Sequence, residues 1–159
     1  TNVAVNSIDF YPTLVEMADA KMPEGQISDG ESLVPILNGG NALQRDALFY
    51  HFPAYLQPKS NNKGVFRARP FGAIRMGDYK LIEFFEYGQL ELYNLAQDSK
   101  ESKNLVLEKP EITAKLLKTM QAWRTKTNAP IPTKRNPEYN EKYAPKNYIT
   151  WQEVKSLLE

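Results

Sequence analysis

Four side chains in the middle of the chain have the types and spacing that suit the binding of a polar or anionic ligand. They are His51, Tyr55, Arg67 and Arg69. His51 stands between two aromatic residues, and the other three lie within residues 53–70, a segment without clear periodicity. Arginine binds anionic groups through its planar fork, and irregular segments of this length are usually functional or disordered. We therefore interpret these four as candidate substrate-binding residues.

A structural role is the alternative for each of them, and it stays open at this stage. A histidine at a strand end is also typical of a packed, hydrogen-bonded core residue. Arg67 and Arg69 can equally be solvated charges, because arginine is mostly exposed in folded proteins.

The sequence offers no catalytic group and no metal site of its own. It has no Cys and a single His, which excludes a cysteine nucleophile, a thiolate metal site and a histidine cluster. No Ser stands in a G-x-S-x-G turn, and the Gly residues are too dispersed for a phosphate-binding loop. We predict no catalytic residue, no metal ligand and no cofactor in this chain.

The acidic residues have simpler interpretations. Asp9, Asp29, Asp78 and Asp98 stand where a helix start or a turn needs a local acceptor, so we interpret them as caps. Glu83, Glu86 and Glu91 lie on or beside predicted hairpin positions. We expect these three carboxylates to be solvated.

The composition is that of one globular domain. The 159 residues are 42% hydrophobic and 11% aromatic, with a net charge of +1, which excludes disorder of the whole chain. Basic residues prevail mildly after residue 100 but are interspersed with acidic ones, so we predict no nucleic-acid binding. No apolar run approaches the roughly 20 residues of a membrane span. The chain begins without Met, and we expect it to be a piece of a longer or processed protein.

Hydrophobic periodicity predicts helices first, then strands, then a further helix. With Asp9 as the N-cap of the first helix, Pro12 stands at its third position, whereas an earlier start at Asn6 or Ser7 would force a kink. Gly77-Asp78 makes a tight hairpin turn. The expected elements are helices over 6–20 and 31–37, strands over 47–52, 71–76, 79–85 and 89–94, a helix over 110–127, and a short helix over 151–158.

These elements predict an α+β fold. An antiparallel sheet of about four strands packs on one C-terminal helix, with two helical segments before it. We expect residues 1–42 to form a helical segment, residues 43–127 the sheet with its helix, and residues 128–159 an extended tail with the short last helix.

Five motifs follow one another between residues 3 and 140. They are Asp9-Phe10-Tyr11-Pro12-Thr13-Leu14, then Asp29-Gly30-Glu31-Ser32-Leu33 with Pro35, Leu37 and Gly39, then Ile74-Arg75-Met76-Gly77-Asp78-Tyr79-Lys80-Leu81-Ile82, then Glu91-Leu92-Tyr93-Asn94-Leu95 with Asp98, Glu101 and Asn104-Leu105, and finally Asn136-Pro137-Glu138-Tyr139. In this order the chain resembles the C-terminal portion of a sulfatase of the arylsulfatase type, in the alkaline-phosphatase-like superfamily. One departure is Asp19, where many relatives carry Gly, and it changes only how the first helix ends.

The resemblance implies an accessory C-terminal subdomain of an enzyme that hydrolyses sulfate esters, expected to act on a sulfated carbohydrate. By the same resemblance, the N-terminal domain of the parent enzyme is the partner of this chain, holds the formylglycine nucleophile and calcium, and is exported with it. The C-x-P-x-R or S-x-P-x-R motif that yields formylglycine is absent here. We expect this chain alone to be inactive. The alternative is a stand-alone α+β module that binds glycan or protein through residues 53–70.

Overall fold

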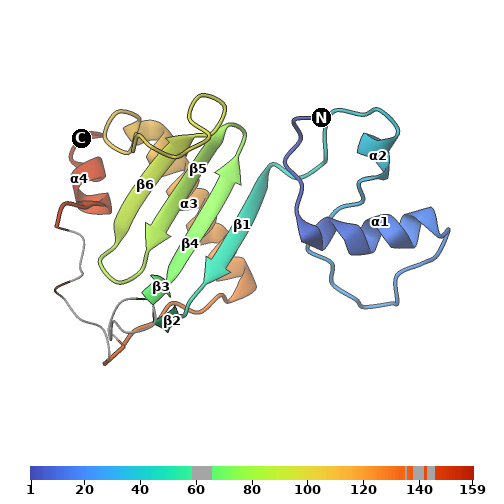
Figure 1. The fold of residues 1–159 in the computed structure, drawn as a ribbon, viewed down its shortest axis with the longest axis horizontal. Coiled ribbons are helices and arrows are strands. Elements are labelled where there is room, and N and C mark those ends of the chain that lie inside the picture. The colour runs from blue at the N-terminus through green and yellow to red at the C-terminus, as the bar shows by residue number, and fades with distance from the viewer. Residues whose placement is uncertain (59–65, 135, 138–141, 143–145) are drawn as a thin grey trace. The chain divides into compact units, whose positions relative to one another are not determined.

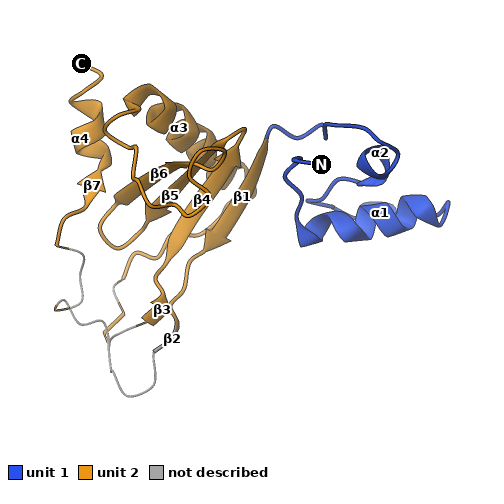
Figure 2. Cartoon of the chain, turned by 45° about the horizontal axis from the view of Figure 1, so that its top comes forward, with its two compact units in different colours: residues 1–46 blue, residues 47–159 orange. Residues whose placement is uncertain are grey.

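The chain folds into two compact units, Thr1–Asp46 and Ala47–Glu159, which we call unit 1 and unit 2. The computed structural model describes residues 1–58, 66–134, 136–137, 142 and 146–159. Figure 1 shows the elements of each unit, and Figure 2 colours the units separately. Each unit is described below by itself.

Unit 2 is built on a five-stranded antiparallel sheet. Its spatial order is β1-β4-β5-β6-β7, and its strands are β1 (Ala47–Phe52), β4 (Phe71–Met76), β5 (Tyr79–Phe84), β6 (Gln89–Asn94) and β7 (Ile149–Thr150). Two short strands, β2 (Leu56–Pro58) and β3 (Phe66–Ala68), pair with each other in a separate ribbon. The α+β prediction is confirmed, with β7 as a fifth strand beside the expected four.

The turn between β4 and β5 explains why this hairpin forms. Gly77 has a φ of 55°, a conformation that side chains with a Cβ resist and glycine adopts readily. The register then runs without a break from Phe71 opposite Phe84 to Met76 opposite Tyr79. Because successive residues of a strand point to opposite faces, this register decides which side chains reach the core.

The core of unit 2 lies between one face of the sheet and the helix α3 (Pro110–Thr127). Pro110 is the first residue of α3, where its missing N–H needs no partner. Asn128 ends the helix in the left-handed conformation, with a φ of 52°. The fully or nearly fully buried core side chains are Ile74, Leu81, Leu90 and Leu92 of the sheet, Leu116, Leu117 and Met120 of α3, and Val106 and Val154 outside them.

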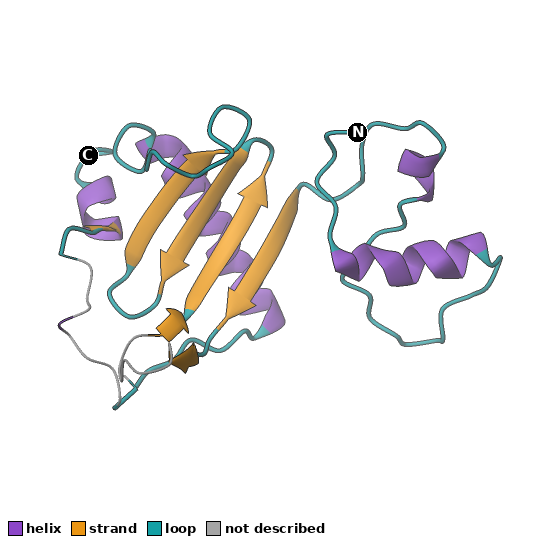
Figure 3. Cartoon of the chain, viewed as in Figure 1, coloured by secondary structure: helices purple, strands orange, loops and turns teal. Residues whose placement is uncertain are grey.

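The C-terminal residues contribute a buried side chain to this core. Thr150 and Glu153 form a capping box at the start of α4 (Trp151–Lys155), and Val154 is fully buried. The helix is shorter than the predicted 151–158, because Ser156 to Leu158 continue only as turns. In Figure 3, α3 lies behind the sheet and α4 stands beside β6 and β7.

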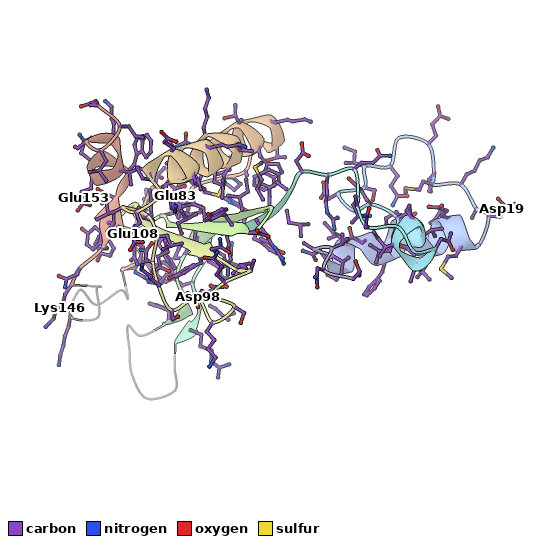
Figure 4. All side chains as sticks on the ribbon, turned by 90° about the horizontal axis from the view of Figure 1, so that it is seen from above. Asp19, Glu83, Asp98, Glu108, Lys146 and Glu153 are labelled. Atoms are coloured by element: carbon purple, nitrogen blue, oxygen red, sulfur yellow. The ribbon has the colours of Figure 1, made fainter. Side chains whose placement is uncertain are left out.

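Unit 1 consists of short helices joined by irregular chain. The elements are the 3₁₀ turn η1 (Ser7–Asp9), α1 (Phe10–Met17) and α2 (Val34–Leu37). Pro12 is the third residue of α1. Both helices are shorter than predicted. Asp19, with a φ of 49°, turns the chain after α1 in the left-handed conformation and lies at the exposed end of the unit (Figure 4).

Asp9 is the buried charge that joins the parts of unit 1. Its side chain is fully buried and accepts hydrogen bonds from the N–H groups of Asn6 at 2.7 Å and Glu31 at 3.1 Å. Arg45 pairs with both carboxylate oxygens, and its Nη2 lies 2.7 Å from Oδ2. Asp9 stands at the predicted N-cap position of α1, but its side chain makes no capping hydrogen bond to that helix. It completes the capping box of η1 and holds two distant segments against it.

The pKa of Asp9 is lowered despite its burial. Burial raises this pKa, but the hydrogen bonds from Arg45, Asn6 and Glu31 outweigh burial, and the pKa lies below its ordinary value of 3.8. A carboxylate with a lowered pKa contributes stability that is present above that ordinary value and is lost as the pH falls through its folded-state pKa.

We predict that unit 1 loses stability as the pH falls below about 4, as Asp9 takes up a proton. Asp9→Asn removes this part of the pH dependence and costs about 3 kcal/mol at neutral pH, because Arg45 loses its partner. Urea unfolding followed by the NMR amide signals of unit 1 measures both effects. Asp29→Asn at an exposed position is the matched control, with little expected change. A variant as stable as the wild type at neutral pH would contradict the role given to Asp9.

Candidate functional site

Two of the predicted site residues, Tyr55 and Arg69, meet at a buried carboxylate. The Tyr55 hydroxyl donates a hydrogen bond to Oε1 of Glu86, and Nη1 of Arg69 lies 3.8 Å from Oε2 of Glu86. The Glu86 side chain is only 3% exposed. We call these three residues the Glu86 cluster. It joins the segment after β1, the segment before β4 and the turn after β5.

Glu86 was expected to be solvated, and this expectation is wrong. The turn after β5 points its side chain inward, where the Tyr55 hydroxyl and the Arg69 guanidinium offset the cost of burying its charge. Glu83 and Glu91 are also paired rather than solvated. Glu83 Oε2 lies 2.5 Å from Arg124 Nη2, and Glu91 accepts from the Gln89 amide at 2.6 Å.

The Tyr55 hydroxyl stays protonated at any physiological pH. Burial raises its pKa well above the ordinary value, and the hydrogen bond to Glu86 and its negative charge raise it further. Tyr93, whose hydroxyl lies 2.9 Å from Glu91, has a raised pKa for the same reasons. Both hydroxyls therefore act as hydrogen-bond donors to their carboxylates.

Arg69 also spans from the Glu86 cluster to the sheet surface. Its guanidinium lies over the ring of Phe84, 4.4 Å from the ring centroid, and Nη2 lies 3.4 Å from Oε1 of Gln89. Its side chain is 23% exposed. A cation held over an aromatic ring, with part of its surface in solvent, can contact an anionic or hydroxylated ligand.

His51 lies on the opposite face of the sheet from Arg69. Its ring packs against Trp123 of α3 at 6.1 Å and against Phe85 at 5.5 Å. Its Nε2 lies 2.8 Å from the carbonyl oxygen of Pro130, so this nitrogen donates the hydrogen bond. The structure thus places His51 beside the C-terminal end of α3, away from the Glu86 cluster.

Arg67 is exposed on β3. It stands two residues before Arg69, and the rest of the basic segment, residues 59–65, lies outside the described residues. Of the four predicted residues, Tyr55 and Arg69 therefore share one carboxylate. Arg67 lies on the ribbon of β2 and β3, and His51 lies on the face of the sheet that packs on α3.

The Glu86 cluster pairs one carboxylate with a tyrosine hydroxyl and a guanidinium, and no metal centre is present among the described residues. No set of three or more His, Asp or Glu side chains among them can hold a metal ion. No helix in the described part of the chain is long and apolar enough to cross a membrane. The site is suited to binding and positioning, with tyrosine and arginine as its donors.

Sequence reasoning missed Glu86 and Arg124. Glu86 follows Phe85 in a turn, and nothing in its local sequence distinguishes it from an exposed carboxylate of a hairpin turn. Arg124 is not singled out from the sequence, whereas its side chain is 6% exposed and its guanidinium lies 5.4 Å from the Phe85 ring centroid. Arg124 follows Met120 by four residues and Leu117 by seven, which places it on the buried side of α3, and that spacing was the available signal.

A family model described as "N-sulphoglucosamine sulphohydrolase, C-terminal" matches residues 1–126. Among curated proteins, a "Sulfatase" of Formosa agariphila is 35% identical over 139 residues, which are 82% of this chain and 25% of that protein. "Arylsulfatase K" of Mus musculus is 27% identical over 151 residues, 94% of this chain and 25% of that protein. The chain thus spans a quarter of the length of these relatives.

One solved structure has a similar fold, and its description names a bound substrate. It is the structure of a protein in complex with its substrate, D-glucosamine-2-N,6-O-disulfate. The likeness has a TM-score of 0.60 and 25% sequence identity, and it covers 79% of this chain and 25% of that one.

Proposed function

Since this chain belongs to the family of sulfatase C-terminal domains, we propose that its parent protein hydrolyses sulfate esters of a sulfated carbohydrate and that this chain is the accessory domain. The match of the family model over residues 1–126 carries the proposal. The two curated relatives are each about four times as long as the region that aligns with this chain, since that region is 25% of each.

The chemical step belongs to the preceding domain in this proposal. The sequence contains no Cys and no S-x-P-x-R from which a formylglycine could be made. Nor do the described side chains fit calcium, because no acidic cluster of sufficient size is present among them. No step of sulfate ester hydrolysis is therefore placed on a residue of this chain. Formylglycine, calcium and export remain proposals for the parent protein as a whole.

The carbohydrate substrate is supported by the neighbour whose description names a disulfated glucosamine. The Glu86 cluster suits such a ligand, because Arg69 offers a partly exposed cation beside the aromatic ring of Phe84. Arginine forms strong hydrogen bonds with anionic oxygens, and a sulfated sugar offers both such oxygens and hydroxyl groups. We propose Arg69 and Arg67 as contacts and Tyr55 with Glu86 as the groups that hold Arg69 in place.

The exposed side of α1 is proposed to pack on the preceding domain. Phe10, Leu14 and Met17 recur at helical spacing and are 62%, 64% and 65% exposed. Unit 1 has no fully buried large apolar side chain of its own, since its buried residues are Asp9, Pro12 and Thr13. An apolar stripe of this kind marks an interaction surface rather than a solvated one.

We predict that the parent protein releases sulfate from a sulfated glucosamine saccharide, while residues 1–159 alone release none above the blank. The expected difference follows because the nucleophile lies outside this chain. Sulfate is measured by ion chromatography with both proteins at equal concentration, with and without calcium. Release by the isolated chain, or none by the parent on any sulfated saccharide, would contradict the proposal.

The contact residues have a separate test in the parent protein. Arg67→Ala/Arg69→Ala should lower kcat/KM on the natural sulfated oligosaccharide by about 10- to 150-fold, the loss of one good charge-assisted contact. Activity on a small aryl sulfate, which cannot span to this segment, should barely change. His51→Ala is measured beside it, because the sequence predicts His51 as a further substrate-binding residue.

Equal losses on both substrates would mean that the variants disturb folding rather than contact the sugar. No loss on the oligosaccharide would leave Arg67 as a solvated charge and Arg69 as the structural partner of Glu86. Lys118→Ala, at an exposed position of α3, is the control for a removed charge and should change neither activity.

A further inference from the structure

The guanidinium of Arg69 faces two buried acceptors. Oε2 of Glu86 lies 3.8 Å from its Nη1, and Oε1 of Gln89 lies 3.4 Å from its Nη2. The Glu86 side chain is 3% exposed and Gln89 is 7% exposed, whereas the Arg69 side chain is 23% exposed. The direction in which Arg69 presents its exposed part to a ligand therefore depends on where these two acceptors lie.

The pair of Arg69 and Glu86 has no direct hydrogen bond that fixes its geometry. Nη1 of Arg69 and Oε2 of Glu86 are both buried, and neither has a hydrogen-bond partner among the described residues. At 3.8 Å the two charges attract each other, but a contact of this length has no strong angular preference. The position of the guanidinium is therefore set by the contacts that hold Glu86 and Gln89.

The contacts around Glu86 come from the C-terminal part of the chain. The backbone of Asn136 forms a hydrogen bond with the Tyr55 hydroxyl, which itself donates to Glu86. The ring of Tyr148 packs on the ring of Tyr87, the residue after Glu86, with the ring centroids 5.4 Å apart. The turn that carries Glu86 is thus held at two points by residues that follow α3.

The second acceptor of Arg69 is held from the same part of the chain. Thr150 of β7 pairs with Gln89 of β6 in the sheet, and the fully buried Val154 anchors the chain just after this pairing. In Figure 1 the orange chain that follows α3 runs past β2 and β3. We call Asn136, Tyr148 and Thr150 the C-terminal contacts.

The C-terminal contacts lie beyond residue 126, where the match of the family model ends. The chain between α3 and β7 is a connecting segment, and such segments vary more among relatives than the elements they join. A contact made from this segment can therefore differ between members of one family, and with it the ligand that each member prefers.

We propose that the C-terminal contacts position the Arg69 guanidinium for an anionic group of the sulfated saccharide, by holding both of its acceptors in place. The proposal rests on the proposed function, because it concerns the same binding surface. Hydrogen bonds weaken steeply as their angle departs from linear, so a small displacement of Arg69 weakens the binding of the saccharide. The C-terminal contacts act through Arg69, and the chemical step does not depend on them.

Tyr148→Ala in the parent protein tests this role, because it removes the ring contact with Tyr87 and leaves Arg67 and Arg69 unchanged. KM for the sulfated oligosaccharide should rise about tenfold with kcat within about twofold, the pattern of lost ground-state binding. KM for a small aryl sulfate should not change. Tyr148→Phe keeps the ring and should retain the KM of the wild type. Leu157→Ala, at an exposed position after α4, is the matched control for a loosened C-terminus and should change neither KM.

Hydrogen exchange of the same proteins separates positioning from direct contact. In Tyr148→Ala, the amides of β3, which precedes Arg69, should exchange at least about fivefold faster than in the wild type. The amides of β4 and β5 should keep their rates. A raised KM with unchanged exchange of β3 overturns the proposal, because Tyr148 would then contact the saccharide itself.

An unchanged KM for the oligosaccharide, or an equal rise of KM for both substrates, also overturns the proposal. A Tyr148→Phe variant as impaired as Tyr148→Ala does the same, because the ring contact would then have no part in the effect. If the wild-type parent protein releases no sulfate from any saccharide, the proposed function fails. The exchange of β3 then decides by itself whether Tyr148 holds the segment of Arg69 in place.

Discussion

The packing of α3 on one face of the sheet is the interaction on which the rest of unit 2 depends. Ile74, Leu81 and Leu92 are fully buried in the three central strands, and they meet the apolar side of α3. A small antiparallel sheet needs such a cover to be stable in water. Once this layer is fixed, the strand register sends Phe84 to one face, where Arg69 lies over its ring, and His51 to the other. The positions of the candidate contacts follow from that.

Unit 1 lacks an equivalent layer, and a polar interaction takes its place. Asp9, bound by Arg45 and two backbone N–H groups, links η1, the segment before α2 and the segment before β1. A buried ion pair specifies one arrangement but is weak support for stability. The stripe of α1 remains exposed as an apolar surface of unit 1. Such a surface fits a chain that is the C-terminal portion of a larger sulfatase.

Local signals predicted most of the fold and little of the site. Gly77 is typical of a tight turn and Pro110 of the first position of a helix, because each residue type suits one backbone geometry. The strand β7 was missed, since two residues have no periodicity and pair only through the distant Gln89 and Leu90. The burial of Glu86 depends on Tyr55 and Arg69, which are far away in sequence. A carboxylate's surroundings are set by tertiary contacts that no local pattern encodes.

Hydrogen exchange of backbone amides, compared between the 159-residue chain and its parent protein, tests the central claim of an accessory domain most directly. The account predicts that β4, β5, β6 and α3 exchange slowest in both proteins. It also predicts that unit 1 exchanges rapidly in the chain alone and at least about tenfold more slowly in the parent, where its apolar stripe is covered. Equal protection of unit 1 in both proteins would contradict the account.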